Sequence, residues 1–315
     1  MSKFLVTGGA GFIGSHIVES LVQKKHFVRV LDNFSSGRKD NLRGVTGRVE
    51  LIKGDIRSKD TCIRVTKGID FVLHQAALRS VPKSMNNPEE YNEVNINGTL
   101  NMLDAALKNK VKSFVFASSS SVYGDVKDFP EKEGLSLSPI SPYALTKLAG
   151  EHYCRIFSLY YSLPTVSLRY FNVFGPRQSL DDEYAVVIPK FISCILNDKS
   201  VPIYGTGKQS RDFTYVANVV EANILASQKQ KSGGEVFNVA CGRDYTILEL
   251  LKILNRIMHK NIKPVFLASR PGDVFKTKAD ITKIKKLLSY SPRINFIRGL
   301  ELTVEYFEKC VRKSL

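Results

Sequence analysis

The sequence predicts an α/β protein built on a doubly wound parallel sheet. Short apolar runs alternate with helical stretches along most of the 315 residues, and these runs are apolar nearly throughout. Strands covered by helices on both faces have this composition, and repeated strand–helix–strand units give parallel strands through right-handed crossovers. The expected strands are 3–7, 27–31, 49–52, 71–73, 114–117, 165–168 and 236–239, and the expected helices lie near 14–24, 58–67, 89–109, 143–161, 217–229, 246–259, 280–288 and 298–312.

The alternation loosens after about residue 172, where proline and glycine recur at Gly175-Pro, Ile188-Pro, Val201-Pro, Gly205-Thr-Gly and Pro271-Gly. We therefore expect two domains. Residues 1–175, joined by about 213–241, form the sheet domain, and 176–315 form a smaller α/β lobe. Such a lobe would close a cleft over the carboxyl ends of the strands, where ligands bind in sheets of this kind.

Composition narrows the class of protein. The net charge of +16 is compatible with nucleic acid or an anionic membrane, but the lysines and arginines are spread out and form no block of five. A basic surface around a site for a charged diphosphate is the preferred interpretation, with no nucleic acid or membrane partner. No apolar run approaches membrane-spanning length, and we expect no signal peptide. Five scattered cysteines without CxxC spacing are typical of a reduced cytoplasmic protein without a metal site.

The first predicted strand leads into a glycine turn and a helix. Gly8, Gly11 and Gly14 are three apart, and Phe12 and Ile13 begin the helix between them. The first glycine makes the turn, the second lets backbone approach a pyrophosphate, and the third lets helix and strand pack closely. Asp32 stands 18 residues after Gly14, at the end of the next strand, followed by Asn33. A carboxylate there accepts both adenosine ribose hydroxyls and repels a 2′-phosphate, so the pattern predicts a Rossmann-type domain that binds NAD rather than NADP.

Further cofactor contacts are expected at the ends of later strands. Asp55 and Ile56 close the third strand, where a side chain could reach the adenine amino group. The segment Gln75, Ala76 and Ala77 follows the fourth strand with small residues that let backbone lie against the cofactor. Asn95 could hold the main chain by a serine-rich turn. Each of these features taken alone is more often structural.

That serine-rich turn, Ser118 to Ser121, follows the buried strand 114–117, and a helix begins after Ser141-Pro142. Ser141 suits the N-cap and Pro142 the first helical position. Tyr143 and Lys147 are four residues apart and so share one helix face. A phenol acts as a base near neutral pH only when its anion is stabilised, and a nearby ammonium and the nicotinamide charge both favour that form.

The same Tyr-x-x-x-Lys spacing occurs at Tyr123/Lys127 and Tyr204/Lys208, so the spacing alone proves little. Glycines interrupt both of these stretches, and neither is expected to be helical. Only the pair Tyr143/Lys147 has a helix cap before it and helix formers through it. The sequence therefore predicts proton chemistry on an alcohol at this pair, with a serine hydroxyl as relay.

Together these motifs resemble the extended short-chain dehydrogenase/reductases, and within them the UDP-sugar 4-epimerases. The resemblance covers nearly the whole chain and is closest to the UDP-N-acetylglucosamine branch. The phrases that carry it are Thr7-Gly-x-x-Gly-x-x-Gly14, Tyr143-x-x-x-Lys147, Arg169-Tyr-Phe-Asn-Val-Phe-Gly175, His74-Gln-Ala-Ala-Leu-Arg-Ser-Val-Pro-Lys-Ser84, Tyr184-Ala-Val-Val-Ile-Pro-Lys190 and Ser210-Arg-Asp-Phe213.

The resemblance implies that Tyr143 is the base, Lys147 its partner and Ser119 the hydrogen-bonding hydroxyl. The substrate contacts it implies are a diphosphate contact at Asn172, a diphosphate clamp at Arg211 and Arg270, a uridine ribose contact at Asp273, a uracil contact along Pro202–Tyr204, and further contacts at Arg79, Ser80, Ser120, Tyr143 and Val187. Tyr170 is expected beside the cofactor. Thr277, the fourth residue after Asp273, is small enough to admit an N-acetyl group on the sugar. Without the resemblance, the arginines would be interpreted as surface ion pairs.

The implied reaction is 4-epimerisation of UDP-N-acetylglucosamine, with the UDP-glucose/UDP-galactose pair also open, by an isomerase that keeps NAD bound. Related dehydratases and decarboxylases carry acids just after the catalytic hydroxyl, where this chain has Ser120 and Ser121, so those activities are disfavoured. Arg79 replaces a glycine common in the N-acetylhexosamine branch, so a UDP-uronic acid substrate stays open; the alternative is that Arg79 points into solvent or to a phosphate. An RNA- or partner-binding relative and an oxidoreductase that releases NADH are the remaining alternatives. A homodimer through helices 89–109 and 143–161 is expected by analogy.

Overall fold

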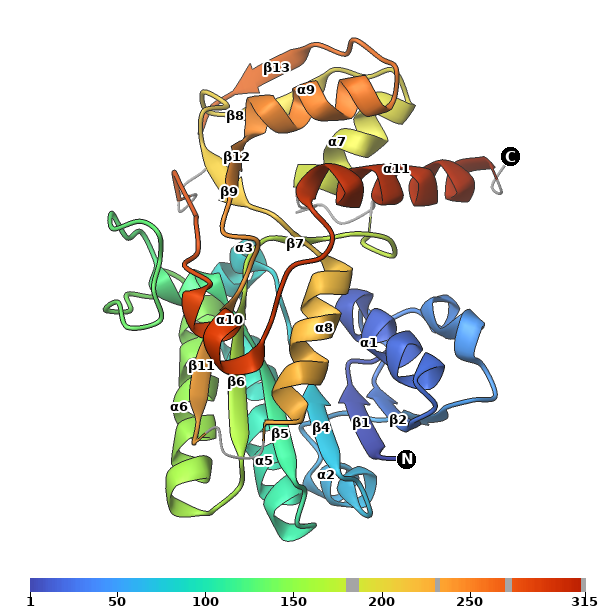
Figure 1. The fold of residues 1–315 in the computed structure, drawn as a ribbon, viewed down its shortest axis with the longest axis vertical. Helices are drawn as coiled ribbons and strands as arrows, with labels where there is room; N and C mark the ends of the chain where they lie inside the picture. The colour runs from blue at the N-terminus through green and yellow to red at the C-terminus, as the bar shows by residue number, and fades with distance from the viewer. Residues whose placement is uncertain (180–186, 230–232, 270–273, 313–315) are drawn as a thin grey trace.

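The computed structural model describes residues 1–179, 187–229, 233–269 and 274–312. Its centre is a seven-stranded parallel sheet in the order β11-β6-β5-β4-β1-β2-β3 (Figure 1). The strands are β1 (Lys3–Thr7), β2 (Phe27–Asp32), β3 (Glu50–Lys53), β4 (Phe71–His74), β5 (Ser113–Ser119), β6 (Thr165–Tyr170) and β11 (Glu235–Val239). The predicted fold class is confirmed, and every predicted strand of the sheet is present with ends that agree within two residues.

The order of the strands reverses between β1 and β4, which are neighbours although β2 and β3 intervene in the sequence. Ligands bind at such a point, outside the carboxyl ends of the strands. The glycine turn after β1 and the serine-rich turn after β5 both lie at that edge of the sheet. The fold therefore brings together the two stretches of sequence that carry the candidate chemistry.

Helices cover both faces of the sheet and enclose two apolar clusters. One face carries α1 (Phe12–Gln23), α8 (Val216–Ser227) and α10 (Thr282–Leu288), whose buried side chains pack with β1, β2, β6 and β11. The other carries α2 (Lys59–Thr66), α5 (Gly98–Lys108) and α6 (Pro142–Tyr160), which pack on Phe114 and Phe116 of β5. Because the strands inside the sheet are covered on both sides, their apolar runs are continuous.

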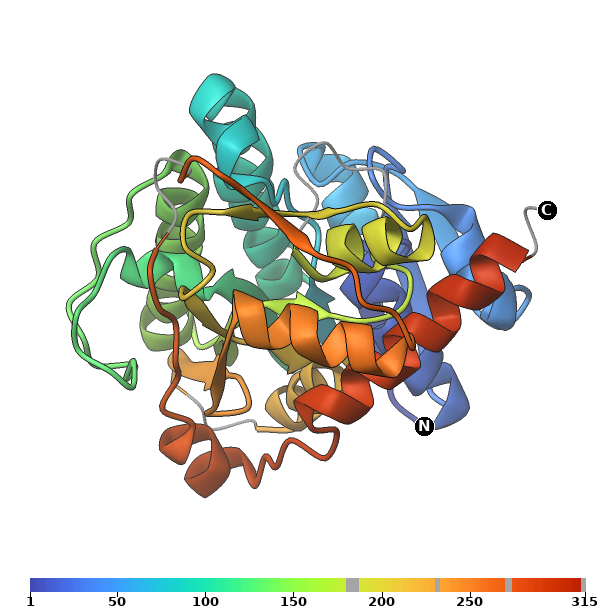
Figure 2. The same cartoon turned by 90° about the horizontal axis from the view of Figure 1, so that it is seen from above.

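A third apolar cluster lies above the sheet, at the top of Figure 1. It joins α7 (Val187–Leu196), β8 (Val201–Tyr204), β10 (Thr214–Tyr215), α9 (Ile247–Ile257) and α11 (Phe296–Arg312). The view from above shows α9 and α11 side by side (Figure 2). Short strand pairs lie nearby: β7 (Val173–Phe174) with β10, β9 (Ser210–Asp212) with β12 (Asp244–Thr246), and β8 with β13 (Pro264–Leu267). The predicted boundary at residue 175 stays a prediction.

The remaining differences are local. The stretch predicted as one helix over 89–109 comprises α4 (Pro88–Tyr91), a π-helical turn over Asn92–Asn97 and α5. Short helices at Lys39–Val45, α3 (Val81–Asn86) and Ser120–Tyr123, and the helix α7, were not predicted. No helix in the described ranges combines the length and apolar character needed to cross a membrane.

Candidate active site

A cavity of about 400 Å³ runs along the carboxyl ends of the central strands, from the turn after β1 to the helix α6. Such a volume is in the usual range for a ligand pocket. All the residues predicted to contact the cofactor line it except Asn95: Gly8, Gly11, Phe12, Ile13, Gly14, Asp32, Asn33, Asp55, Ile56, Gln75, Ala76, Ala77, Tyr143, Lys147 and Tyr170. The sequence motifs therefore converge on one continuous surface.

The glycine turn fits the backbone of a dinucleotide site. Gly8 has a positive φ of 65°, and its N–H donates to the Leu31 carbonyl at 2.8 Å. A Cβ on Gly14 would lie 2.2 Å from the Gly8 carbonyl oxygen, so only glycine lets α1 approach β1 this closely. A Cβ on Gly11 would meet only that same oxygen, at 3.1 Å, which leaves its other side open for a ligand. The amides at the start of α1 are thereby available to an anion.

Asp32 is fixed at the end of β2 by two backbone amides. Its carboxylate accepts the Ala10 N–H at 2.9 Å and the Phe34 N–H at 2.8 Å, one on each oxygen. Burial raises the pKa of Asp32, and these two hydrogen bonds oppose that shift. Each oxygen keeps a lone pair, so the carboxylate can still accept ribose hydroxyls.

Asp55 has a partner that the sequence analysis missed. The Arg57 guanidinium donates to its two oxygens at 3.0 and 2.8 Å, and the Asn33 amide donates at 3.0 Å. The hydrogen bond from Arg57 holds the pKa of Asp55 well below its usual range. Arg57 also lines the cavity. Its position two residues after Asp55 was the available signal.

The predicted role of Asn95 needs correction. Its side chain holds the main chain after β4, because it accepts the Leu78 N–H at 2.8 Å and donates to the Leu78 carbonyl at 3.0 Å. It also donates to the Thr146 hydroxyl of α6 at 3.0 Å. Asn95 therefore ties the loop after β4 to α6 and does not contact the serine-rich turn. It lies behind the cavity wall, in the π-helical turn.

The chemical end of the cavity is built by the first turns of α6. The Ser141 hydroxyl accepts the Ala144 N–H at 3.2 Å, and Pro142 takes the first helical position, as predicted. Lys147 is 5% exposed, and its ammonium donates to the Ala117 carbonyl at 2.8 Å. The ammonium also lies 5.1 Å from the centre of the Phe116 ring. Burial lowers the pKa of Lys147 from its ordinary 10.5 to about 8.

Tyr143 lies next to Lys147 and to the serine-rich turn. Burial raises the pKa of its phenol, while a hydrogen bond with Ser119 and the positive charge of Arg79 oppose that shift. The Lys147 ammonium lies 5.9 Å from the centre of the Tyr143 ring and donates to the Ala117 carbonyl, and its expected effect on the pKa of Tyr143 stays a prediction. The Ser119 hydroxyl also accepts hydrogen bonds from the Ser121 N–H and hydroxyl, at 3.2 and 2.9 Å.

The two other Tyr-x-x-x-Lys matches are not helical pairs, as predicted. Tyr123 ends the short helix Ser120–Tyr123 and is fully buried, with its hydroxyl donating to Asn238 at 2.7 Å. Tyr204 ends β8. Only Tyr143 and Lys147 therefore share a helix face.

The residues predicted to bind substrate fall into separate groups. Arg79 lines the cavity. Asn172, Arg211 and Thr277 form a buried junction above the sheet, in which the Asn172 amide donates to the Asp212 carbonyl at 3.1 Å and to the Thr277 hydroxyl at 3.0 Å. Arg211 donates to the Ser210 and Phe275 carbonyls at 2.9 and 3.3 Å. This junction is not part of the cavity lining.

The other members of that set lie apart or cannot be placed. Ser80 caps α3 by accepting the Lys83 N–H, and Ser120 begins the short helix after β5. Val187 begins α7, and Tyr204 is half-buried at the end of β8. Arg270 and Asp273 lie outside the described residues.

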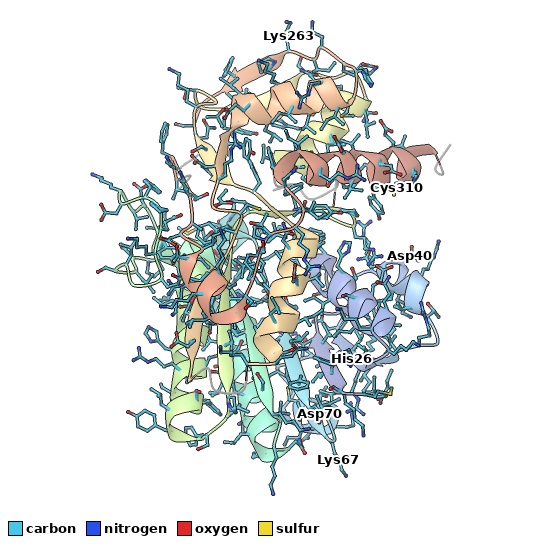
Figure 3. All side chains as sticks on the ribbon, viewed as in Figure 1. His26, Asp40, Lys67, Asp70, Lys263 and Cys310 are labelled. Atoms are coloured by element: carbon cyan, nitrogen blue, oxygen red, sulfur yellow. The ribbon has the colours of Figure 1, made fainter. Side chains whose placement is uncertain are left out.

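The C-terminal helix α11 contributes cavity residues that the sequence analysis missed. Tyr306, Phe307 and Cys310 line the cavity, as do Arg38 and Asn41, which follow β2. Figure 3 shows Cys310 at this end of α11, on the same side of the molecule as Asp40. The remaining missed residues of the lining include Ser35, Ser36, Glu90, Val94, Arg177, Gln178 and Ser179. No local signal marks them, since they come together only through the fold.

Comparison with known proteins agrees with this geometry. The model of the NAD dependent epimerase/dehydratase family matches residues 4–240. A solved UDP-N-acetylglucosamine 4-epimerase from Methanobrevibacter ruminantium M1 is 42% identical, with a TM-score of 0.94 over 98% of this chain and 99% of that one. A UDP-glucuronic acid 4-epimerase from Bacillus cereus, solved with UDP-glucuronic acid and NAD, is 35% identical, with a TM-score of 0.90 over 98% and 99%. A UDP-N-acetyl-alpha-D-glucosaminuronate decarboxylase from Bacillus cytotoxicus is 36% identical over 98% of both chains. The chain belongs to the NAD dependent epimerase/dehydratase family, and its cofactor is NAD.

Proposed function

We propose that this protein is a UDP-sugar 4-epimerase that interconverts UDP-N-acetylglucosamine and UDP-N-acetylgalactosamine, and also acts on UDP-glucose and UDP-galactose. The observation that carries the proposal is the arrangement at one end of the NAD cavity. There the Tyr143 phenol is hydrogen-bonded to Ser119 and lies beside the buried ammonium of Lys147. The two residues after Ser119 are hydroxyls rather than acids.

Each residue of the site has a separate proposed role. Tyr143 removes the proton of the sugar 4-hydroxyl and returns a proton after the sugar has turned. Ser119 hydrogen-bonds the same oxygen and relays the proton, while Lys147 supplies positive charge at the phenol and can hold ribose hydroxyls. The bound NAD supplies reversible hydride transfer at C4 of the sugar. Because no net oxidation occurs, the cofactor stays bound through many turnovers.

The serine-rich turn favours epimerisation over dehydration and decarboxylation. Elimination of water needs an additional acid and base beside the sugar, and in the related dehydratases these groups follow the catalytic hydroxyl. Here Ser121 donates its hydroxyl hydrogen to Ser119, and Ser120 begins a short helix. These hydroxyls titrate far above neutral pH and are poor general acids. A site of this kind can exchange a proton and a hydride without expelling a leaving group.

The junction of Asn172, Arg211 and Thr277 is the proposed anchor for the substrate. It lies where β9 meets the segment after β6, and both Arg211 and Thr277 are buried there. A guanidinium suits diphosphate oxygens, and a small side chain at Thr277 leaves room for an N-acetyl group. Arg270 and Asp273 are proposed to complete the clamp and the ribose contact.

Arg79 supports a second candidate, a UDP-uronic acid substrate. Its side chain lines the cavity, and its positive charge acts on the Tyr143 phenol. A guanidinium in that position could form a bidentate pair with a sugar 6-carboxylate. The similarity to a UDP-glucuronic acid 4-epimerase is compatible with this alternative.

Proton NMR of the anomeric signals separates these candidates. The purified protein is incubated separately with UDP-N-acetylglucosamine, UDP-glucose and UDP-glucuronic acid, and each product is identified. The proposal expects the galacto epimer from the first two sugars, and turnover confined to the uronic acid would favour the second candidate. Loss of C6, a stable 4-keto-6-deoxy product or net release of NADH would overturn epimerisation. Tyr143→Phe is the inactive control.

The assembly is proposed from the exposed face of α6. Leu145, Ile156, Leu159 and Tyr160 are 55, 43, 55 and 78% exposed on this helix, although it also packs on the sheet. A second copy that pairs its α5 and α6 with these residues would bury this apolar surface in a homodimer. We also propose a cytoplasmic location. A role in binding nucleic acid is disfavoured because the cavity contains both members of the proposed catalytic pair, Tyr143 and Lys147.

A further inference from the structure

Behind the candidate active site, a buried ion pair joins α6 to β6. Glu151 of α6 and Arg169 of β6 have side chains 5 and 3% exposed, and Arg169 Nη2 lies 2.7 Å from Glu151 Oε2. Arg169 Nε donates to the other oxygen at 2.9 Å, so the contact is bidentate. The guanidinium also lies 4.7 Å from the centre of the Tyr123 ring. The proposed chemistry assigns neither residue a role.

Glu151 lies on the same helix face as the catalytic pair. Tyr143, Lys147 and Glu151 are successive residues at a spacing of four, so they stack along α6. Lys147 and Glu151 bind two adjacent residues of β5. Lys147 donates to the Ala117 carbonyl, and the Glu151 carboxylate accepts a hydrogen bond from the Ser118 hydroxyl at 2.5 Å. The rotation of α6 about its axis is therefore fixed by two neighbouring contacts.

Ser118 and Arg169 are direct cross-strand partners in the register of β5 and β6. Phe114, Phe116 and Ser118 alternate along β5 on the face that packs against α6. One carboxylate thus reaches two adjacent strands at the point where β5 enters the serine-rich turn. Ser118 itself lies between Ala117, whose carbonyl holds Lys147, and Ser119, whose hydroxyl holds Tyr143.

From this geometry we infer that Glu151 and Arg169 are positioning residues, which hold the serine-rich turn and α6 in the register that places Ser119 against Tyr143. The inference rests on the proposed epimerase function. A bidentate guanidinium–carboxylate contact has a defined geometry, unlike a single hydrogen bond. Because both ions are buried, neither can rotate away without losing its partner. A shift at Ser118 would move the contacts of both Lys147 and Tyr143 together.

Two variants separate positioning from simple support of the fold. Ser118→Ala removes the hydroxyl that ties the turn to Glu151 and leaves the ion pair in place, so the fold should persist. Glu151→Gln keeps the shape and removes the charge. We expect kcat to fall about tenfold in Ser118→Ala and about 100-fold in Glu151→Gln, with KM nearly unchanged, since small misplacements of reacting groups have costs of this order. The pH profile of kcat should move upward, because a weaker bond from Ser119 raises the pKa of Tyr143.

The matched control is Glu50→Gln. Glu50 of β3 forms a cross-strand ion pair with Arg29 of β2, in which Arg29 Nε lies 2.8 Å from Glu50 Oε2. Three strands of the sheet, β4, β1 and β2, separate β3 from β5 and its serine-rich turn. The variant Glu50→Gln should keep the kcat of the wild type. If Ser118→Ala and Glu151→Gln both retain the kcat of the wild type per folded molecule, with an unshifted pH profile, the pair is structural only and the inference is overturned.

A second measurement is independent of the proposed substrate. Ultraviolet difference absorbance titrates the Tyr143 phenolate in the NAD-bound protein, with Tyr143→Phe in each background as the reference. The inference expects titration at higher pH in Ser118→Ala than in the wild type, and equal titration overturns it. If the wild type turns over no UDP-sugar, the proposed function fails while this titration still decides the positioning role.

Discussion

Burial of Lys147 has a consequence for stability that opposes its role in the site. Its pKa falls from 10.5 to about 8 because the ammonium is desolvated. A depression of this size corresponds to about 3 kcal/mol of unfavourable free energy for the buried cation. Lys147→Met removes the charge and keeps an unbranched side chain of similar length. The hydrogen bond to the Ala117 carbonyl is also lost, which costs the variant about 1 kcal/mol. Near neutral pH the NAD-free variant should therefore be more stable than the wild type by about 2 kcal/mol.

The sign of this difference should reverse with pH. The unfolded lysine titrates near its ordinary pKa, so between about pH 8 and 10 the unfolded wild type holds a proton that the folded protein has released. The wild type therefore gains stability relative to the variant as pH rises through this range. Above about pH 10 Lys147 is neutral in both states, and only the lost hydrogen bond remains, so the variant becomes less stable by about 1 kcal/mol.

Urea unfolding of the two NAD-free proteins, followed by circular dichroism near pH 7 and pH 10, measures this reversal. The contributions of all other titrating groups cancel in the difference between the two free energies of unfolding, because both proteins contain them. A variant that is less stable by the same amount at both pH values would refute the reasoning, since it would show that the buried ammonium carries no desolvation cost. Loss of epimerase activity is expected in either case and does not test the stability argument.

Gly14→Ala should lower the urea midpoint and abolish NAD binding, because its Cβ would lie 2.2 Å from a backbone oxygen. The control is Gly47→Ala, whose Cβ would have no atom within 4 Å and which should cost only about 1 kcal/mol of backbone strain. His74 is buried in its neutral form, with its pKa lowered to about 3. As pH falls below about 6.5, the wild type should lose stability relative to His74→Gln, by at most about 1.4 kcal/mol per pH unit. A difference in the free energy of urea unfolding that does not change with pH would contradict this. Ile156→Glu should convert the proposed dimer to a monomer in light scattering, and an unchanged mass would place the interface elsewhere.

The fold could be predicted because burial on both faces leaves a local mark in the sequence. β4 and β5 are buried at nearly every position, and their sequences are apolar on consecutive residues. At the edge of the sheet, β3 is half-exposed to exposed, and its predicted start came one residue early. The predicted ends of β5 and β6 came two residues early. Caps gave the start of α6 correctly, because Ser141 and Pro142 act through contacts within one turn.

The lining of the cavity could be predicted where a residue belongs to a continuous motif or ends a predicted strand. The glycine turn and the Tyr143/Lys147 pair are continuous motifs, and Asp32 and Gln75 stand at strand ends. Asn95 failed because its partners, Leu78 and Thr146, are 17 and 51 residues away, and a π-helical turn has the same local pattern as an α-helix. The α11 residues at the cavity could not be found locally, since their approach depends on the packing of the third apolar cluster.

Gly150 shows why the polar contacts of the site depend on the apolar packing around them. It lies between Lys147 and Glu151 on α6, where a Cβ would come within 2.3 Å of the Phe116 ring. Its missing side chain therefore lets the helix approach β5 closely enough for Lys147 to reach the Ala117 carbonyl and for Glu151 to reach Ser118. Glycine within a helix costs about 1 kcal/mol relative to alanine. That cost occurs where a closer contact between helix and strand brings a phenol, an ammonium and a serine hydroxyl close together.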